Sequence, residues 1–79
     1  MVDIIIVGRF SHLTKNGNSK YIVNVFKYDD RASVFLEDRQ YYKNIGRITK
    51  KGLSIYKSDI VELKNVYIEQ GYNVQVLSV

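Results

Sequence analysis

Residues 2–10 read Val2-Asp3-Ile4-Ile5-Ile6-Val7-Gly8-Arg9-Phe10, and this stretch decides which fold the chain is expected to adopt. Apolar residues at alternate positions predict a strand with one buried face. The inward-facing set is Val2, Ile4, Ile6 and Phe10. Gly8 interrupts the run and predicts a bend or bulge. A long first strand that bends partway can serve both halves of a small barrel, so the stretch favours an OB-like barrel.

The rest of the chain divides into short segments that are typical of strands and turns. The further strands are expected at Tyr21–Tyr28, Arg31–Glu37, Ile45–Thr49, Leu53–Lys57, Val61–Glu69 and Tyr72–Val79, the last two pairing across Gln70-Gly71. The connections are expected to be a hairpin loop at Ser11–Lys20, a tight turn at Asp29-Asp30, a loop or one helical turn at Asp38–Asn44, and a hairpin turn at Lys50-Lys51-Gly52. Ser58-Asp59 followed by Glu62 resembles a helix-capping signal, so a short helix at Asp59–Leu63 stays open.

These segments predict one domain spanning residues 1–79, either all-β or β with one short helix. The expected architecture is a small OB-like or SH3-like barrel of five to six strands, with a β-sheet dimer as the remaining candidate. A chain of 79 residues is too short for a doubly wound nucleotide-binding fold. Its 46% hydrophobic and 25% charged residues indicate a globular protein rather than a disordered one.

Several kinds of site are excluded by composition. The chain has no cysteine and one histidine, which removes disulfides, thiolate metal sites and a structural zinc site, so no cofactor or metal is expected. The longest apolar run, Ile4-Ile5-Ile6-Val7, is far shorter than the roughly 20 residues of a membrane span. We therefore expect a soluble, cytoplasmic protein without a membrane partner.

The most informative pattern is the distribution of charge. Lysine and arginine number 12 against 8 acids, giving a net charge of +4. No acid lies between Asp38 and Asp59, where basic residues alternate with tyrosines. Cations follow phosphates and aromatic rings stack on bases, so the pattern predicts single-stranded nucleic-acid binding. The expected phosphate contacts are Arg39, Arg47, Lys50 and Lys51, the expected stacking rings are Tyr41, Tyr42 and Tyr56, and Lys43 and Lys57 complete this part of the interface.

Each of these features also has an ordinary structural explanation. Tyrosine is a good strand former whose ring packs while its hydroxyl reaches water. Lysines in hairpin turns serve solubility and protect sheet edges from aggregation. The polar loop Ser11–Lys20 is either a flap over a bound strand or an ordinary hairpin connection. A basic face that is only solvated therefore remains an alternative to a binding face.

The stretch from Val7-Gly8-Arg9-Phe10 through Lys15-Asn16-Gly17-Asn18-Ser19-Lys20 to Tyr21-Ile22-Val23-Asn24-Val25 resembles the opening of small phage-type single-stranded-DNA-binding OB-fold proteins. In that family a strand with a glycine–arginine or glycine–asparagine step leads through a polar, glycine-containing loop to a strand of alternating hydrophobics. The resemblance covers about a quarter of the chain. It implies a five-stranded barrel, sequence-tolerant binding of single strands, and assembly as a dimer or higher oligomer. It carries over Arg9, Lys15, Lys20 and Tyr21 as strand-contacting positions.

Two functions of other classes compete with this prediction. A compact β domain with exposed tyrosines also suits a protein-interaction or inhibitor domain acting by surface complementarity, because tyrosine and arginine are enriched in binding hot spots. Such a domain can also act by edge-strand pairing, in which an edge such as Tyr72–Val79 pairs with a partner or with a second copy. A metal-free ribonuclease is the third hypothesis, with Arg47, Lys50, Tyr56 and His12 as its set of groups. We expect no enzyme, because His12 has no evident partner group in the sequence. The expected partners are single-stranded DNA or RNA, with a protein partner and a homodimer left open.

Overall fold

The computed structural model describes residues 2–27 and 39–78. Its elements are β1 (Ile4–Leu13), β2 (Ser19–Lys27), α1 (Arg39–Ile45), β3 (Arg47–Thr49), β4 (Gly52–Tyr56), α2 (Lys57–Glu69) and β5 (Val74–Ser78). The predicted turn at Asp29-Asp30 and the predicted strand at Arg31–Glu37 lie outside the described residues. The predicted hairpins formed by β1 with β2 and by β3 with β4 are present, with β1 running three residues further than expected.

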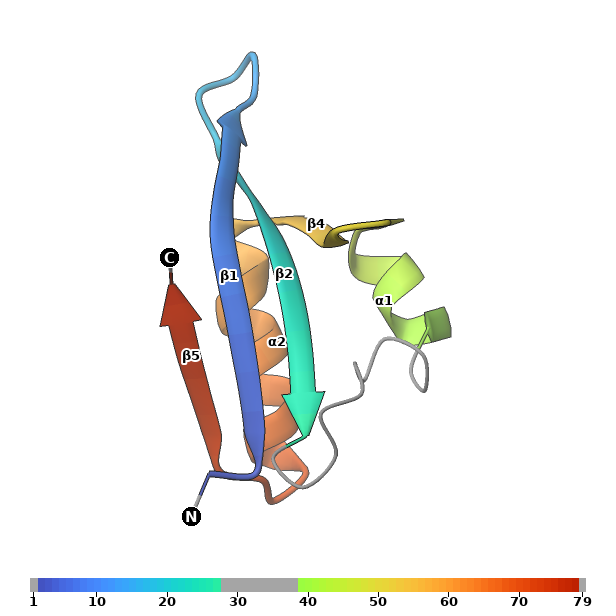
Figure 1. Ribbon diagram of the computed structural model, residues 1–79, viewed down its shortest axis with the longest axis vertical. Coiled ribbons are helices and arrows are strands. Elements are labelled where there is room, and N and C mark those ends of the chain that lie inside the picture. Colours follow the sequence, from blue (N-terminus) through green and yellow to red (C-terminus); the bar gives the residue numbers. More distant parts are fainter. Residues whose placement is uncertain (1, 28–38, 79) are drawn as a thin grey trace.

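The five strands in the described part of the chain form one mixed sheet in the order β3-β4-β2-β1-β5. β1 pairs with β2 antiparallel and with β5 parallel, and β4 joins β2 to β3 in antiparallel ladders. Figure 1 shows β5 beside β1, with α2 lying behind β1 and β2, and β3 forms the edge opposite β5. Within residues 2–27 and 39–78 the sheet is not closed into a barrel, so the prediction of an OB-like or SH3-like barrel is wrong. A small, mostly β domain with helices is confirmed.

Helix α2 replaces one of the strands expected from the sequence. The predicted strand at Val61–Glu69 is wrong, because residues 57–69 form a helix. Leu63 and Tyr67, four residues apart, lie on one helical face and are buried against the sheet. Asp59 accepts a hydrogen bond from the backbone N–H of Tyr56 at 3.0 Å. The N-cap is therefore Tyr56 and Asp59 is the third helical residue, so the helix is longer than expected and its cap is not the predicted pairing of Ser58-Asp59 with Glu62.

The crossover through α2 also decides how the last strand pairs. A strand that follows a crossover helix can return parallel to its neighbour, as β5 does beside β1. The prediction that Tyr72–Val79 pairs with the segment before it is therefore wrong. The loop before β5 is fixed by the carboxylate of Asp3, which accepts a hydrogen bond from the N–H of Asn73 at 2.8 Å.

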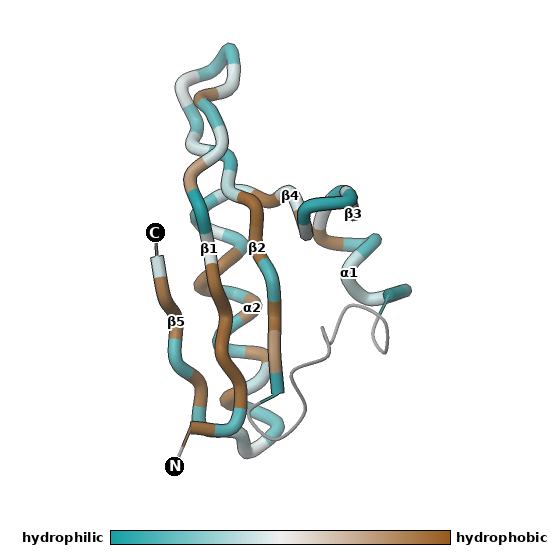
Figure 2. The backbone as a smooth tube through the Cα atoms, in the orientation of Figure 1, coloured by the Kyte–Doolittle hydropathy of each residue, from teal (hydrophilic) through white to brown (hydrophobic). Residues whose placement is uncertain are grey.

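The core lies between the sheet and the helices. Alternate residues of the strands point toward α2, and the brown colouring along β1 and β2 in Figure 2 marks these apolar segments. The buried set is Ile4, Ile6, Val23, Val25, Leu53 and Ile55 from the sheet, Tyr42 from α1, and Leu63 and Tyr67 from α2. The hydroxyls of Tyr42 and Tyr67 form a hydrogen bond with each other, which satisfies polar atoms that would otherwise be costly to bury.

Gly8 is buried at the contact between β1 and α2. A Cβ atom at this position would lie 3.4 Å from Cδ1 of Ile60, an ordinary van der Waals contact with α2. The irregularity in the pairing of β1 lies instead between Phe10 and His12. The prediction of a bulge at Gly8 is therefore wrong, because the pairing of β1 with β2 is regular through this residue.

Candidate functional site

The face of the sheet opposite α2 is the open face, and among the described residues no helix covers it (Figure 1). Successive strand residues point to opposite faces, so the neighbours of the buried residues lie here. The open-face residues of the two long strands include Ile5, Val7 and Arg9 of β1 and Lys20, Ile22, Asn24 and Phe26 of β2. The apolar members of this set are half-buried, which leaves an apolar floor accessible to a ligand.

Four strands contribute to one row across the open face. Arg9 of β1 lies directly opposite Ile22 of β2, and Ile22 lies opposite Ser54 of β4. Ser54 in turn lies opposite Arg47 of β3. With neighbouring strands roughly 4.8 Å apart, the two arginines are separated by about 14 Å at the backbone. The row therefore has a cation at each end and an uncharged floor between them.

Lys51 enters this row from the turn between β3 and β4, whose backbone is fixed by three hydrogen bonds. The side-chain amide of Asn24 donates to the carbonyl of Lys51 at 3.1 Å, which ties the turn to β2. The hydroxyl of Thr49 donates to the carbonyl of Gly52 at 2.7 Å and accepts from the N–H of Lys51 at 3.2 Å. The turn is thus held in one conformation beside the open face.

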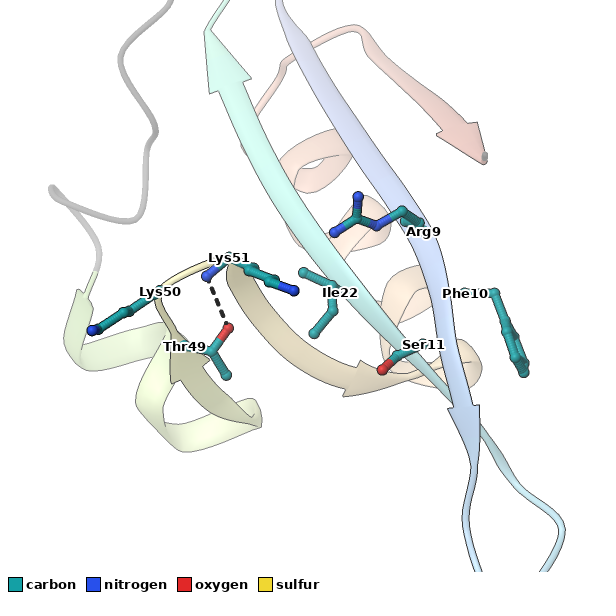
Figure 3. A pocket seen from close by; sticks show the side chains of 7 residues that line it. All are labelled: Arg9, Phe10, Ser11, Ile22, Thr49, Lys50 and Lys51. Carbon is teal, nitrogen blue, oxygen red and sulfur yellow. Dashed lines mark hydrogen bonds between the residues drawn. The ribbon is translucent and has the colours of Figure 1, made fainter.

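Figure 3 shows how the side chains lie at this point. Arg9 and Lys51 extend toward Ile22 from opposite sides, whereas Lys50 extends away from it. Two adjoining shallow hollows of about 470 and 520 Å³ lie here and share Arg9, Ile22 and Lys51. Two cations therefore flank a half-buried isoleucine in a surface depression, an arrangement suited to an anion that is attached to an apolar group.

A second row lies beside the first. His12 of β1 is opposite Lys20 of β2, and Lys20 is opposite Tyr56 of β4. The ammonium of Lys20 lies 4.0 Å from the centre of the Tyr56 ring, a cation–π contact. His12 is exposed, and its Nδ1 shares a hydrogen bond of 2.9 Å with the hydroxyl of Ser11.

The acids of the described residues lie elsewhere. Asp59, Glu62 and Glu69 are on α2, behind the sheet. Asp3 precedes β1 at the end farthest from the hairpin and is held by Asn73. Within residues 2–27 and 39–78, the open face around Arg9 and Lys51 therefore carries positive charge without acidic neighbours on its strands.

The structure brings together part of the interface expected from the sequence. The open-face rows and the adjoining turn hold Arg9, Lys20, Arg47, Lys50, Lys51 and Tyr56. The remaining basic residues are dispersed: Lys15 lies in the hairpin tip, Arg39 and Lys43 lie on α1, and Lys57 begins α2. Lys57 lines a groove on the helix side of the sheet rather than the open face.

Three of the expected tyrosines face the core. Tyr42 is fully buried, so the prediction that its ring stacks on a base is wrong. Tyr21 is half-buried on the helix side of β2 and packs edge-on against Phe10, with ring centres 5.8 Å apart. Tyr41 packs against the core from α1, and burial, followed by the charge of Glu62, raises the pKa of its hydroxyl. Of the four tyrosines expected in the interface, Tyr56 is the one that the structure places on the open face.

Sequence reasoning missed the uncharged members of the site. Ile22 forms the floor between Arg9 and Lys51, and Asn24 anchors the lysine turn. Thr49 holds the lysine turn through its hydrogen bond to Gly52, and Ser54 lies in the first row opposite Arg47. The available signal was the alternation of β2, which places Lys20, Ile22 and Asn24 on one face once Val23 and Val25 are assigned to the core.

Three further findings concern metal binding, membrane-spanning helices and similarity to known proteins. Among the described residues, no group of three or more histidine, cysteine, aspartate or glutamate side chains is placed to hold a metal ion. In the same part of the chain, no helix has the length and apolar character needed to cross a membrane. Comparison with known protein families, with curated proteins and with solved structures finds no match to this chain.

Proposed function

We propose that the protein binds single-stranded nucleic acid, without strong sequence preference, on the open face of its sheet. The observation that carries the proposal is the row from Arg9 through Ile22 and Ser54 to Arg47, with Lys51 extending over it. Cations at the rim attract phosphates, while the uncharged floor between them accepts the less polar parts of a nucleotide. Contacts of cations with phosphates and of apolar or ring surfaces with base faces carry little sequence information, so little discrimination between sequences is expected.

The apolar floor favours single strands over duplexes. A duplex presents phosphates and groove edges, but its base faces are stacked inside. A single strand can turn its bases toward Val7 and Ile22 and onto the ring of Tyr56, which is 39% exposed. Stacking on an aromatic ring contributes about 1–3 kcal/mol per base. Lys20 already lies over one face of the Tyr56 ring, so a base there stacks on the other face or displaces the ammonium.

The test is a titration of labelled single-stranded DNA, single-stranded RNA and duplex DNA at several salt concentrations. For single strands, the logarithm of the binding constant falls with the logarithm of salt concentration by about 0.7 for each phosphate neutralised. Lys51→Ala and Arg9→Ala should each weaken binding and flatten the slope by about 0.7. Lys64→Ala is the matched control, because it removes the same charge from α2, on the other side of the sheet.

Three outcomes would contradict the proposal. Absence of binding at low salt would leave the basic face as a solvated surface. Equal affinity for duplex and single strands would show attraction to any polyanion, because the floor would then contribute nothing. Equal losses in Lys51→Ala and Lys64→Ala would show that net charge alone governs binding.

A second candidate is cleavage of RNA without a metal ion, and the row of His12, Lys20 and Tyr56 favours it. A histidine beside a lysine and a phenol can supply a proton-transfer group and a cation for a phosphate. We expect turnover of labelled RNA in chelator to be lost in His12→Ala if this candidate holds. Intact RNA after prolonged incubation with the unaltered protein would exclude it and leave binding as the function.

A further inference from the structure

The edge formed by β5 lacks the features that normally keep a sheet edge from pairing. Its residues, Val74-Gln75-Val76-Leu77-Ser78, include no charge and no proline, and their register with β1 is regular. In the described part of the chain, β5 is the last strand on its side of the sheet. The opposite edge differs: β3 has three residues, carries Arg47 and leads directly to Lys50 and Lys51. Charge and short length are the usual protections of an edge strand, and β5 has no charge and is the longer of the two edges.

Exposed apolar side chains gather beside this edge. Val76 and Leu77 are 36% and 42% exposed on β5, and Val61 and Ile68 are 59% and 46% exposed on α2. Val61 and Ile68 are seven residues apart, which places them on the same flank of the helix. A groove of about 190 Å³ lies between α2 and β5, lined by Ile60, Val61, Val76 and Leu77 among others.

The charges around the edge differ between its two ends. Lys57 lines the groove together with Ser78, at the end of β5. At the start of β5, Asp3 is hydrogen-bonded to Asn73, and Glu69 is the last residue of α2. The edge is therefore basic at one end, acidic at the other and uncharged between them.

We propose that β5 pairs antiparallel with β5 of a second copy of the chain, about a two-fold axis, so that two sheets become one. Antiparallel pairing sets the basic end of each edge beside the acidic end of the other, whereas parallel pairing would set like charges together. Directly opposite residues in the joined sheet must point to the same face. The two-fold axis therefore has to pass through a position where one residue lies opposite the same residue of the second copy, and not through a point midway between two residues. Val76, at the middle of the strand, is the position that pairs all five residues: it then lies opposite Val76 of the second copy.

A second copy fits this edge better than an unrelated chain for two reasons. In the antiparallel pair, the basic end of each edge lies beside the acidic end of the other, and opposite residues lie on the same face of the joined sheet. The net charge of +4 makes two copies repel each other over most orientations, and the uncharged β5 is where that repulsion is weakest. Pairing also covers Val76 and extends the apolar groove across the axis. This inference does not depend on the nucleic-acid proposal, although the joined sheet would place two open faces side by side.

The first test is the oligomeric state of the full chain, measured by sedimentation equilibrium over a wide range of concentrations. A monomer–dimer equilibrium is expected. Val76→Lys sets two ammonium groups opposite each other at the axis and should weaken dimerisation at least tenfold. Leu13→Lys makes the same change at a residue that is 61% exposed near the hairpin tip, and should leave dimerisation unchanged. A monomer at all concentrations, or dimers equally weakened by the two changes, would overturn the proposal.

A second test keeps the proposal falsifiable if Val76→Lys fails to fold. The chain has no cysteine, so a single Val76→Cys substitution is a clean reporter. Cβ atoms of directly opposite residues in an antiparallel pair are near enough for a disulfide. Mild oxidation should therefore cross-link Val76→Cys into covalent dimers much faster than Leu13→Cys. Equal cross-linking rates would show that copies meet by random collision and would overturn the antiparallel pairing at Val76.

Discussion

The two faces of the sheet are built from alternate residues of the same strands, yet they differ in both burial and charge. Ile4 and Ile6 are buried beneath α2, whereas Ile5 and Val7, one residue further along, are half-buried on the open face. The helix face carries the core, and the open face carries Arg9, Arg47 and Lys51 at its rim. The difference shows that apolar residues on the open face are not needed to form the core and are free to contact a ligand.

The largest expected difference between the faces is in stability. Leu63→Ala removes a fully buried side chain from beneath the sheet and should lower the free energy of unfolding by about 2–5 kcal/mol. Ile22→Ala on the open face should cost only about 1 kcal/mol, because its side chain is already partly in contact with water. Urea unfolding followed by circular dichroism measures both. Equal losses would mean that the two faces are equally important for folding.

The next comparison concerns two hairpin turns. Gly52 has φ +143°, and a Cβ atom there would lie 2.8 Å from the carbonyl oxygen of Val23, so Gly52→Ala should cost about 2–3 kcal/mol. Gly17, at the tip of the β1–β2 hairpin, has φ +80°, but a Cβ atom there would meet nothing within 4 Å, so Gly17→Ala should cost about 1 kcal/mol. Thermal unfolding compares the two variants. A Gly52→Ala protein as stable as Gly17→Ala would show that the turn beside β2 can relax.

The third comparison separates the buried tyrosine from the exposed one. Tyr42→Phe removes the hydroxyl that bonds to Tyr67 and should lower stability by about 1–2 kcal/mol, with affinity for single-stranded DNA unchanged. Tyr56→Phe keeps an exposed ring on the open face and should change stability little. Parallel unfolding and binding titrations test the pair. A loss of affinity in folded Tyr42→Phe would contradict the assignment of Tyr42 to the core.

The smallest effect is a dependence on alkaline pH. The pKa of Tyr41 is raised above its ordinary value of 10.0 by burial and by Glu62, so the folded state favours the neutral hydroxyl. Its contribution to stability is therefore present below pH 10.0 and is lost as the pH rises through the raised pKa. Tyr41→Phe should lose less stability than the unaltered chain between about pH 8 and about pH 11. The measurement is the free energy of unfolding as a function of pH. Identical curves for Tyr41→Phe and the unaltered chain would show that Tyr41 does not cause the loss of stability at alkaline pH.

Local pattern was sufficient to predict the hairpins but not the closure of the sheet. The alternation of β1 and β2 and the turn at Lys50-Lys51 are properties of neighbouring residues, and they predicted real elements. Whether the sheet closes into a barrel depends on which strand pairs with the last segment of the chain. That segment, β5, pairs with β1, whose residues are about 70 positions away in the sequence. The β-branched Val61, Val66 and Ile68 made the segment Val61–Glu69 resemble a strand. Leu63 and Tyr67, four residues apart, fit one face of a helix instead.

The charged part of the candidate site was easier to predict than the rest. Arg47 and Lys51 stood out as cations in a segment without acids, and Arg9 was expected from the resemblance. The fold places all three around one surface. Tyr42 stood out equally as an aromatic residue in a basic segment, but a ring on a helix packs inward as readily as outward. Ile22 and Asn24 carry no charge, and their roles depend on the register between β2 and β4.

The most direct test of the open face is a map of backbone amide signals by NMR during titration with a short single-stranded DNA. We expect the largest changes at Arg9, Ile22 and Lys51, with smaller ones at Ser54 and Arg47, and little change along α2 from Val61 to Glu69. Changes concentrated on α2 or α1, with the open face unaffected, would contradict the proposal that this face binds the strand.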